Sequence, residues 1–313
     1  MIVTLTPNPS IDRTITLSEP LTRGGVIRST TSHDDPGGKG VNVAQVVRNA
    51  GQLAVAVLPG DHDDPLLVRL RELRLTHRAV PTGLPSRVNI TLAEPDGVTT
   101  KVNAPGPLLD QAHLDQLVRE VAREGVGARW AVLCGSLPPG VDPGWYAEVV
   151  AALADHGLAI ALDTSGEPLR LAVERVPDRI ALLKPNTEEL ADLVDADSSD
   201  LDDVGAIVDA ARPLLAAGVG AVLLTRGSRG AVLLTDEGTW AVDAPPVQAR
   251  STVGAGDSAL AGYLLGALDG LDPAKRLTLA VTYGSAAASL PGSTMPSPTD
   301  LPPLTEARRW NEG

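Results

Sequence analysis

The chain has 313 residues, of which 43% are hydrophobic and 21% are charged, and its formal net charge is -13. A chain of this length can bury one large core, or one core with a small appendage. Four Trp, three Tyr and no Phe mean that this core is aliphatic. The acidic excess excludes nucleic acid as a general partner, because a phosphate-binding surface needs an excess of basic residues. A phosphorylated ligand must therefore meet locally concentrated positive charge.

The single cysteine, Cys134, excludes a disulfide framework and is typical of a reducing compartment. It lies in an apolar run and is expected to be a buried small hydrophobe rather than a nucleophile. The first residues lack the basic segment and long apolar stretch of a secretory signal. No charge-free window of 18 apolar residues suits a membrane span. We therefore expect a cytoplasmic protein that makes no membrane contact.

Short apolar strands alternate with helical segments along the chain. The predicted strands are Met1–Thr6, Ala54–Leu58, Ala131–Cys134, Leu158–Leu162, Ile180–Leu183 and Ala221–Thr225. The predicted helices are Gly40–Ala50, Asp110–Glu124, Pro143–His156 and Leu201–Ala217. This alternation predicts an α/β fold over residues 1–313 as one domain, with a doubly wound, mainly parallel sheet between helices. Ligands of such sheets bind at the carboxyl ends of the strands.

Two segments, 13–31 and 87–102, depart from this pattern. They alternate in polarity and carry hairpin turns, such as Pro95-Asp96-Gly97 in the second segment. We expect them to form a small antiparallel β lid over the main sheet. An unpaired sheet exposes surface that can associate with other chains. We therefore also expect the lid to pair with its copy in a homodimer. The segment Pro291–Pro303, rich in Pro and Ser, is expected to be irregular.

The segment Ser251–Ser258 carries the strongest indication of chemistry. Glycines at the start of a helix leave backbone N–H groups free to bind an anion, with the positive end of the helix dipole behind them. Gly254, Ala255 and Gly256 form such a cradle, and Asp257 follows directly. A carboxylate base beside an anion site suggests phosphoryl transfer.

Two other interpretations of this segment stay open. Asp is common in the first turn of helices because it offsets the dipole, so the glycines could form only a tight turn. The spacing Gly254-x-Gly256-x-x-Ala259 also fits the dinucleotide fingerprint of an oxidoreductase. That match is weak, because Pro245–Arg250 is a poor strand and the position of the expected acid falls in a helical region.

Three further loops lie where strands meet helices. Pro36–Ala44 is a glycine-rich loop with one embedded cation, Lys39, which needs an anionic partner if it is buried. It is not a Walker A loop because no Ser or Thr follows the lysine, and its glycines could serve only close helix packing. In Lys184–Glu189, Glu189 could complete a capping box with Asn186 or hold Mg²⁺ through water. Gly135–Gly140 presents Ser136 at the same sheet edge, or forms only a turn.

Together these motifs resemble, in their order along the chain, the phosphofructokinase B branch of the ribokinase-like sugar kinases. The resemblance covers nearly the whole chain through Asn8–Asp12, Gly37–Ala44, Arg87–Asn89, Gly135–Pro138, Lys184–Asn186, Thr225–Gly227 and Thr252–Asp257. It implies the fold expected above, with a β lid that forms dimers in many members. It also implies ATP as co-substrate and Mg²⁺ as cofactor in the phosphorylation of a sugar phosphate.

The resemblance further implies a role for each matching residue. Asp257 would take the proton of the sugar hydroxyl, while Gly254, Ala255 and Gly256 would hold the migrating phosphoryl group. The sugar phosphate would be bound by Asp12, Gly38, Lys39, Asn42, Arg87, Asn89 and Ser136, with Lys39, Arg87 and Ser136 on its existing phosphate. The nucleotide would be bound by Lys184, Asn186, Thr225, Gly227 and Ser228, and the metal by Glu189. The segment 280–285 lacks the Asn that many relatives carry near the adenine.

Lys39 also bears on the choice of substrate. A lysine between these glycines resembles the fructose 1-phosphate and tagatose 6-phosphate kinases of the branch, whereas fructose 6-phosphate kinases tend to carry another glycine. The resemblance therefore implies conversion of fructose 1-phosphate to fructose 1,6-bisphosphate. Tagatose 6-phosphate kinase and 6-phosphofructokinase are the alternatives, and a catalytically silent sugar-phosphate sensor is a more remote one.

Overall fold

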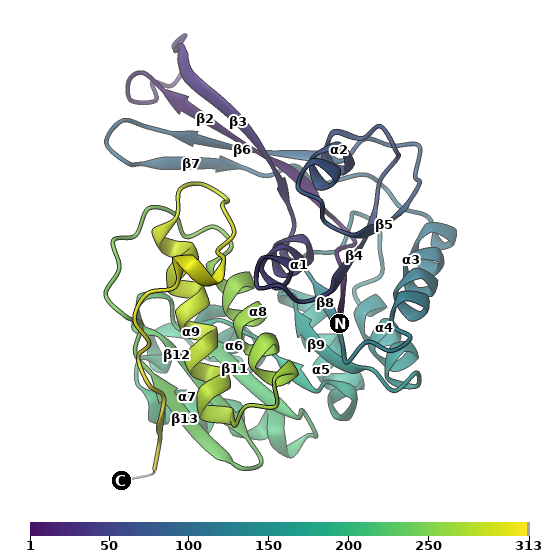
Figure 1. The fold of residues 1–313 in the computed structure, drawn as a ribbon, viewed down its shortest axis with the longest axis vertical. Coiled ribbons are helices and arrows are strands. Elements are labelled where there is room, and N and C mark those ends of the chain that lie inside the picture. The colour runs from purple at the N-terminus through teal and green to yellow at the C-terminus, as the bar shows by residue number, and fades with distance from the viewer. Residues whose placement is uncertain (312–313) are drawn as a thin grey trace.

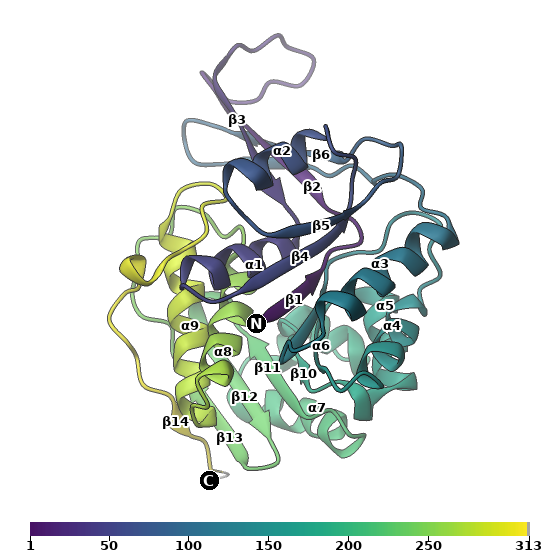
Figure 2. The same cartoon turned by 45° about the vertical axis from the view of Figure 1, so that its right-hand side comes forward.

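The computed structural model describes residues 1–311, and within them the chain forms a ten-stranded sheet with helices on both faces (Figures 1 and 2). From one edge to the other the strands are β5 (His77–Val80), β4 (Ala54–Pro59), β1 (Ile2–Leu5), β8 (Trp130–Cys134), β9 (Ala159–Asp163), β10 (Leu182–Leu183), β11 (Ala221–Thr225), β12 (Ala231–Thr235), β13 (Gly238–Val242) and β14 (Arg308–Arg309). All neighbours from β5 to β11 run parallel, and the last three strands are antiparallel. The predicted doubly wound, mainly parallel sheet is confirmed.

Alternate residues of the apolar strands pack against different helix layers, which gives two aliphatic cores. One layer contains α1 (Lys39–Asn49), α2 (Pro65–Glu72), α8 (Ala255–Leu268) and α9 (Pro273–Ser289). The other contains α3 (Gln111–Glu124), α4 (Trp145–Ala154), α5 (Gly166–Arg175), α6 (Thr187–Leu193) and α7 (Val204–Ala216). The predicted segments differ from these elements only at their ends. Asp110 and Asp203, for example, cap α3 and α7 with their side chains, so each helix begins at the next residue.

The lid is a separate four-stranded sheet above the carboxyl edge (Figure 1). Its order is β3 (Ser29–Gly37), β2 (Ser10–Leu17), β6 (Arg87–Ala93) and β7 (Thr99–Val102). Both hairpins are antiparallel as predicted, but the central pair β2–β6 runs parallel. Local turn signals could not predict that pairing, because its strands are far apart in sequence. The first hairpin also extends beyond 13–31 at both ends, so it leads directly into α1.

The register of the main sheet brings its carboxyl ends together. Cys134 lies opposite Asp163, and Leu183 lies opposite Leu162. The next residue, Lys184, donates its backbone N–H to the Leu162 carbonyl at 3.1 Å. Residues that follow β8, β9 and β10 therefore face one another beneath the lid.

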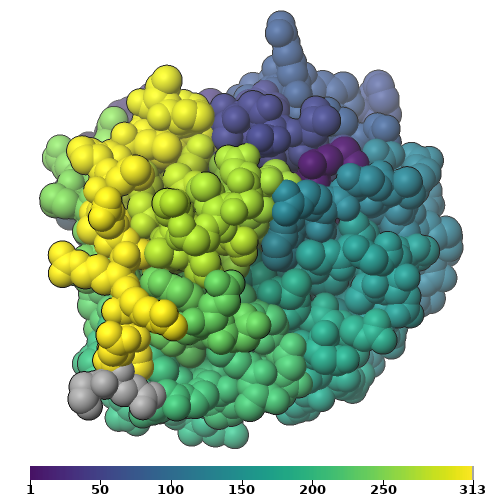
Figure 3. Space-filling view, turned by 60° about the horizontal axis from the view of Figure 1, so that its bottom comes forward, coloured from purple at the N-terminus to yellow at the C-terminus, as the bar shows by residue number. Residues whose placement is uncertain are grey.

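After α9 the chain crosses the surface as an irregular segment, visible as the yellow band in Figure 3. The prediction for Pro291–Pro303 is confirmed, since its one regular element is the short 3₁₀ turn Pro298–Asp300. The segment is anchored where Ala307 donates its N–H to Thr278 Oγ1 at 3.0 Å. Across residues 1–311, we found no helix with the length and apolar character to span a membrane.

Candidate active site

The predicted anion cradle lies at the start of α8. Gly254 has a φ of 72°, and the helix begins at Ala255 without a side-chain cap. A methyl group built on Gly254 would lie 2.5 Å from the Met295 methyl carbon, so this position requires glycine for its conformation and for space. The helix start therefore has no side-chain cap, and Ala255 donates its N–H to the Thr252 carbonyl only at 3.4 Å. These features suit the binding of an anion.

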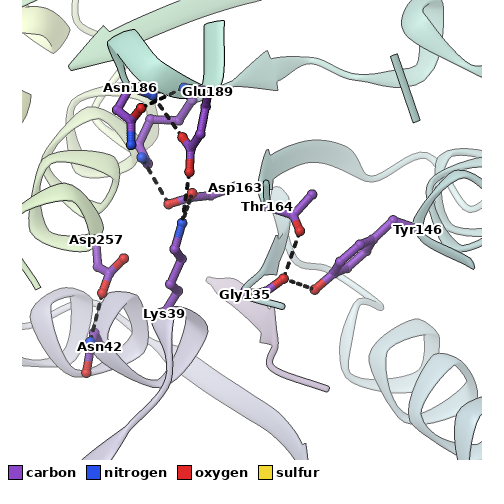
Figure 4. Close-up of polar contacts among 10 residues, drawn as sticks. Lys39, Asn42, Gly135, Tyr146, Asp163, Thr164, Asn186, Glu189 and Asp257 are labelled. Carbon is purple, nitrogen blue, oxygen red and sulfur yellow. Dashed lines mark hydrogen bonds and ion pairs between the residues drawn. The ribbon is translucent and has the colours of Figure 1, made fainter. Parts of the chain in front are cut away.

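Asp257 lies in the first turn of α8 and is only 7% exposed. Asn42, from α1, donates its amide N–H to Asp257 Oδ2 at 2.7 Å (Figure 4). Burial, and secondly the charge of Asp163, raise the pKa of Asp257 to about 6, although Asn42, Lys39 and Lys184 act against the rise. A carboxylate with this pKa is still mostly ionised at neutral pH and has the basicity that suits a general base.

Asp163 is the residue that sequence reasoning missed. Its side chain is fully buried at the end of β9, where Lys39 Nζ donates to Oδ1 at 2.7 Å and Lys184 Nζ lies 3.1 Å from Oδ2. Burial alone would raise the pKa of Asp163, but the two ammonium groups outweigh it and leave the pKa lowered. The sequence did indicate a position in the site, because Asp163 directly follows a predicted strand at the ligand edge, as Lys184 does.

Lys39 begins α1 and extends toward two carboxylates. Besides Asp163, it faces Glu189, whose Oε1 lies 3.8 Å from Lys39 Nζ (Figure 4). Burial would lower the pKa of Lys39, but Asp163 and Glu189 raise it well above its ordinary value. The anionic partner that the sequence required for this lysine is therefore Asp163, with Glu189 further away.

Glu189 also forms the capping box with Asn186 that the sequence suggested as its other role. It donates its backbone N–H to Asn186 Oδ1 at 2.8 Å and accepts from the Asn186 N–H at 2.9 Å through Oε2. This capping box starts α6 and fixes one carboxylate oxygen, while the other faces Lys39. Capping and a place in the site therefore coexist.

The other residues assigned to the nucleotide lie along the same edge. Lys184 is 4% exposed, and a methyl group on Gly256 would lie 3.6 Å from its Nζ. Asn186 and Thr225 form a parallel bridge that joins the ends of β10 and β11. Gly227 and Ser228 follow in an exposed 3₁₀ turn.

Asp12 lies on the lid, near the start of β2. Ser10 donates its hydroxyl to Asp12 Oδ1 at 2.7 Å, and Asn89 of β6 donates its amide to the same oxygen at 3.0 Å. Gly37 of β3 lies so close that any side chain there would overlap the Asp12 carboxylate. The lid therefore holds this carboxylate through two hydrogen bonds to Oδ1.

Arg87 and Ser136 meet around Asn8. Arg87 donates to the carbonyls of Ala104 and Asn8 at 3.0 and 2.9 Å, and Asn8 donates its amide to Ser136 Oγ at 3.4 Å. The Arg87 Nε is buried without a hydrogen-bond partner, and burial lowers the pKa of this arginine. Among the described residues no hydrogen bond or ion pair joins Lys39 to Arg87 or Ser136. In the free protein the three residues assigned to the sugar's phosphate therefore belong to two separate sets of polar contacts.

The comparisons with known proteins decide the family. The family model described as "pfkB family carbohydrate kinase" matches residues 5–300. The chain belongs to this family. That membership selects the sugar-kinase hypothesis over the dinucleotide oxidoreductase.

Individual relatives match over nearly the whole chain. The 1-phosphofructokinase of Rhodobacter capsulatus is 35% identical over 97% of this chain and 95% of its own. The ATP-dependent 6-phosphofructokinase isozyme 2 of Escherichia coli strain K12 is 31% identical over 96% of each chain. Among solved structures, phosphofructokinase-2 from Escherichia coli in complex with potassium has a TM-score of 0.87 and 29% identity over 96% of each chain. Arabidopsis thaliana ribokinase, with a TM-score of 0.72 and 20% identity over 96% of this chain and 95% of its own, shares the fold.

The raised pKa of Asp257 predicts that its negative charge opposes folding. A rise from 3.8 to about 6 corresponds to ~3 kcal/mol. That cost is absent below about pH 4, where the carboxyl is protonated in both states, and is complete above about pH 6. We expect Asp257→Asn to raise the free energy of unfolding at pH 8 by about 1–3 kcal/mol and to have little effect at pH 4, measured by urea unfolding. The control is Asp236→Asn in an exposed turn; a loss of stability in Asp257→Asn at pH 8 would contradict the prediction.

Proposed function

We propose that the protein transfers the terminal phosphoryl group of ATP to fructose 1-phosphate and forms fructose 1,6-bisphosphate and ADP. The observation that carries this proposal is the buried Asp257, with a pKa of about 6, at the uncapped start of α8. Membership of the pfkB family supports the reaction class. The relatives named 1-phosphofructokinase support the substrate.

In the proposed reaction Asp257 accepts the proton of the O6 hydroxyl. The bond between O6 and the phosphorus forms, while the bond from phosphorus to the bridging oxygen of ATP breaks and its electron pair leaves with ADP. The backbone N–H groups of Gly254 to Gly256 bind the phosphoryl oxygens, where fixed donors stabilise charge without reorganisation. The Asn42 amide keeps the Asp257 carboxylate oriented toward this position.

Mg²⁺ fits the carboxylates of the site only together with phosphate oxygens. Within residues 1–311 no group of three or more His, Cys, Asp or Glu is arranged to hold a metal. Mg²⁺ is usually held by one or two carboxylates, waters and the phosphates of a substrate. We assign it to Glu189, whose Oε1 is not used in the capping box. Bound there, Mg²⁺ would neutralise charge on the nucleotide phosphates.

The sugar phosphate is assigned to the space between the lid and the sheet edge. Asp12 and Asn89 present polar groups from the lid, and Asn42 presents one from α1. Arg87, with its unpartnered Nε, and Ser136 are assigned to the phosphate that the sugar already carries. One substrate alternative has support of its own, because a relative at 31% identity is named 6-phosphofructokinase isozyme 2.

The substrate assignment predicts a large preference between two isomers. The phosphate already present fixes which hydroxyl faces the base. We expect kcat/KM for fructose 1-phosphate to exceed that for fructose 6-phosphate by roughly 100-fold, which corresponds to ~2.7 kcal/mol. A steady-state comparison that includes tagatose 6-phosphate measures this preference. As the control, Asp257→Asn should lower kcat by roughly 10²- to 10⁴-fold. A higher kcat/KM with either 6-phosphate would refute the substrate assignment.

We propose further that the protein is a homodimer that pairs through its lid. In the lid register Ile15 lies opposite Leu92, and Ile90 lies opposite Val102. These four apolar side chains share the face opposite Asp12, and none of them is fully buried. A second copy of the same face would cover them and protect the sheet.

The dimer proposal predicts twice the chain mass by light scattering at micromolar concentration. Ile90→Asp, which places a charge on the apolar face, should shift the protein toward the monomer. Val126→Asp is the matched control, because Val126 is 82% exposed outside the lid and should leave the dimer intact. A fully active protein with the mass of one chain would refute this proposal.

A further inference from the structure

The polar partners of Lys39 differ from those of Arg87 and Ser136, the other residues considered for the sugar's phosphate. Its Nζ is 2.7 Å from Asp163 and 3.8 Å from Glu189. In Figure 4 the lysine extends from α1 toward Asp163 and Glu189, and Asp257 lies to one side of it. Arg87 instead lies by Asn8 and Ser136, and it has a buried N–H with no hydrogen-bond partner. Arg87 can therefore supply the positive charge for the sugar's phosphate, and Lys39 is not needed for that role.

On the basis of the function proposed above, we propose that Lys39 is a catalytic residue that binds the phosphoryl group in transit, and that it competes with Mg²⁺ for Glu189. In the free protein Asp163 and Glu189 together neutralise Lys39. During the reaction the ammonium group remains near Asp163 and turns toward the cradle at Gly254 to Gly256.

The charges of the cluster support this movement. Two lysines share the Asp163 carboxylate, so the trio keeps one net positive charge, which faces the nearby carboxylates of Glu189 and Asp257. At 3.8 Å the Lys39–Glu189 contact is longer than a hydrogen bond. A dication at Glu189 would repel the ammonium group. The released positive charge would then face the start of α8, where the transferred group passes.

The two lysines differ in their freedom to move. Lys184 is 4% exposed and lies close to Gly256, so it is fixed beside the cradle. The Lys39 side chain is 34% exposed and ends a flexible stem, so its ammonium group can rotate from one acceptor to another. Lys184 thus supplies a constant charge, whereas Lys39 supplies one that responds to the ligands.

The first test separates the transferred group from the sugar's own phosphate by steady-state kinetics. Lys39→Met keeps the length of the side chain and removes its charge. We expect kcat to fall by roughly 10²- to 10³-fold, the effect of losing one donor to developing charge, with the KM for fructose 1-phosphate within about 3-fold. Arg87→Ala is the contrasting variant and should raise that KM by roughly 10- to 150-fold, because it loses a charged hydrogen bond to the bound substrate. Lys39→Arg keeps the charge and should recover part of kcat.

The second test uses binding measurements that do not depend on turnover. ADP with tetrafluoroaluminate and fructose 1-phosphate mimics the group in transit, and Lys39→Met should bind this complex at least 10-fold more weakly than the unchanged protein. Its affinity for ADP alone should stay within about 3-fold. With the protein saturated by ADP, whose phosphates complete the metal site, Lys39→Met should bind Mn²⁺ at least roughly 3-fold more tightly by electron paramagnetic resonance, because a competing cation has been removed.

The outcomes separate this inference from the proposed function. If the unchanged protein phosphorylates fructose 1-phosphate but Lys39→Met raises its KM and keeps kcat, Lys39 binds the sugar's phosphate and the inference fails alone. A reduced kcat with unchanged binding of the tetrafluoroaluminate complex or of Mn²⁺ would also overturn it, because Lys39 would then act only on the fold. If the unchanged protein has no activity on fructose 1-phosphate, the proposed function fails, and the Mn²⁺ result still decides whether Lys39 competes with a cation.

Discussion

The buried carboxylate of Asp163 is the constraint on which the site depends. An ionised carboxylate without exposure to water is costly unless charged partners surround it. Here the partners are Lys39, the first residue of α1, and Lys184, which directly follows β10. These ion pairs connect three separate parts of the chain at the carboxyl edge of the sheet. Loss of Asp163 would leave two ammonium groups beside the cradle without their shared counter-ion.

The same carboxylate helps to set the basicity of Asp257. Its negative charge adds to burial in raising the pKa of Asp257, whereas the two lysines and the Asn42 amide act in the opposite direction. The resulting value of about 6 leaves a base that is ionised at neutral pH and still able to accept a proton. The arrangement therefore joins two requirements of phosphoryl transfer, a proton acceptor and nearby positive charge.

Much of this arrangement could be predicted from the sequence, because the responsible signals are local. The glycines before Asp257 predicted an open helix start, and Asn186 with Glu189 predicted a capping box. Apolar runs such as Ile2–Leu5 predicted the central strands. Each of these features depends on a few neighbouring residues, so the pattern of residue types was sufficient.

The remaining features depend on contacts between distant segments. Asp163 becomes significant only when the register of β8, β9 and β10 brings it between two lysines. The parallel pairing of β2 with β6 needs the folded lid, and β3 has no apolar alternation to mark its full length. The direction of the Lys39 side chain could also not be predicted from the sequence. A glycine-rich loop predicts that a lysine needs an anion, but it does not identify which one.

The central claim, that Asp163 tunes the base, is tested most directly by the pH dependence of kcat/KM, which reports the groups of the free enzyme. The unchanged protein should lose activity as the pH falls through about 6, the pKa of Asp257. Asp163→Asn, confirmed as folded by circular dichroism, should be slower, and its acidic limb should move to lower pH, because a negative charge that raises this pKa has been removed. An acidic limb that stays in place or moves to higher pH would contradict the account.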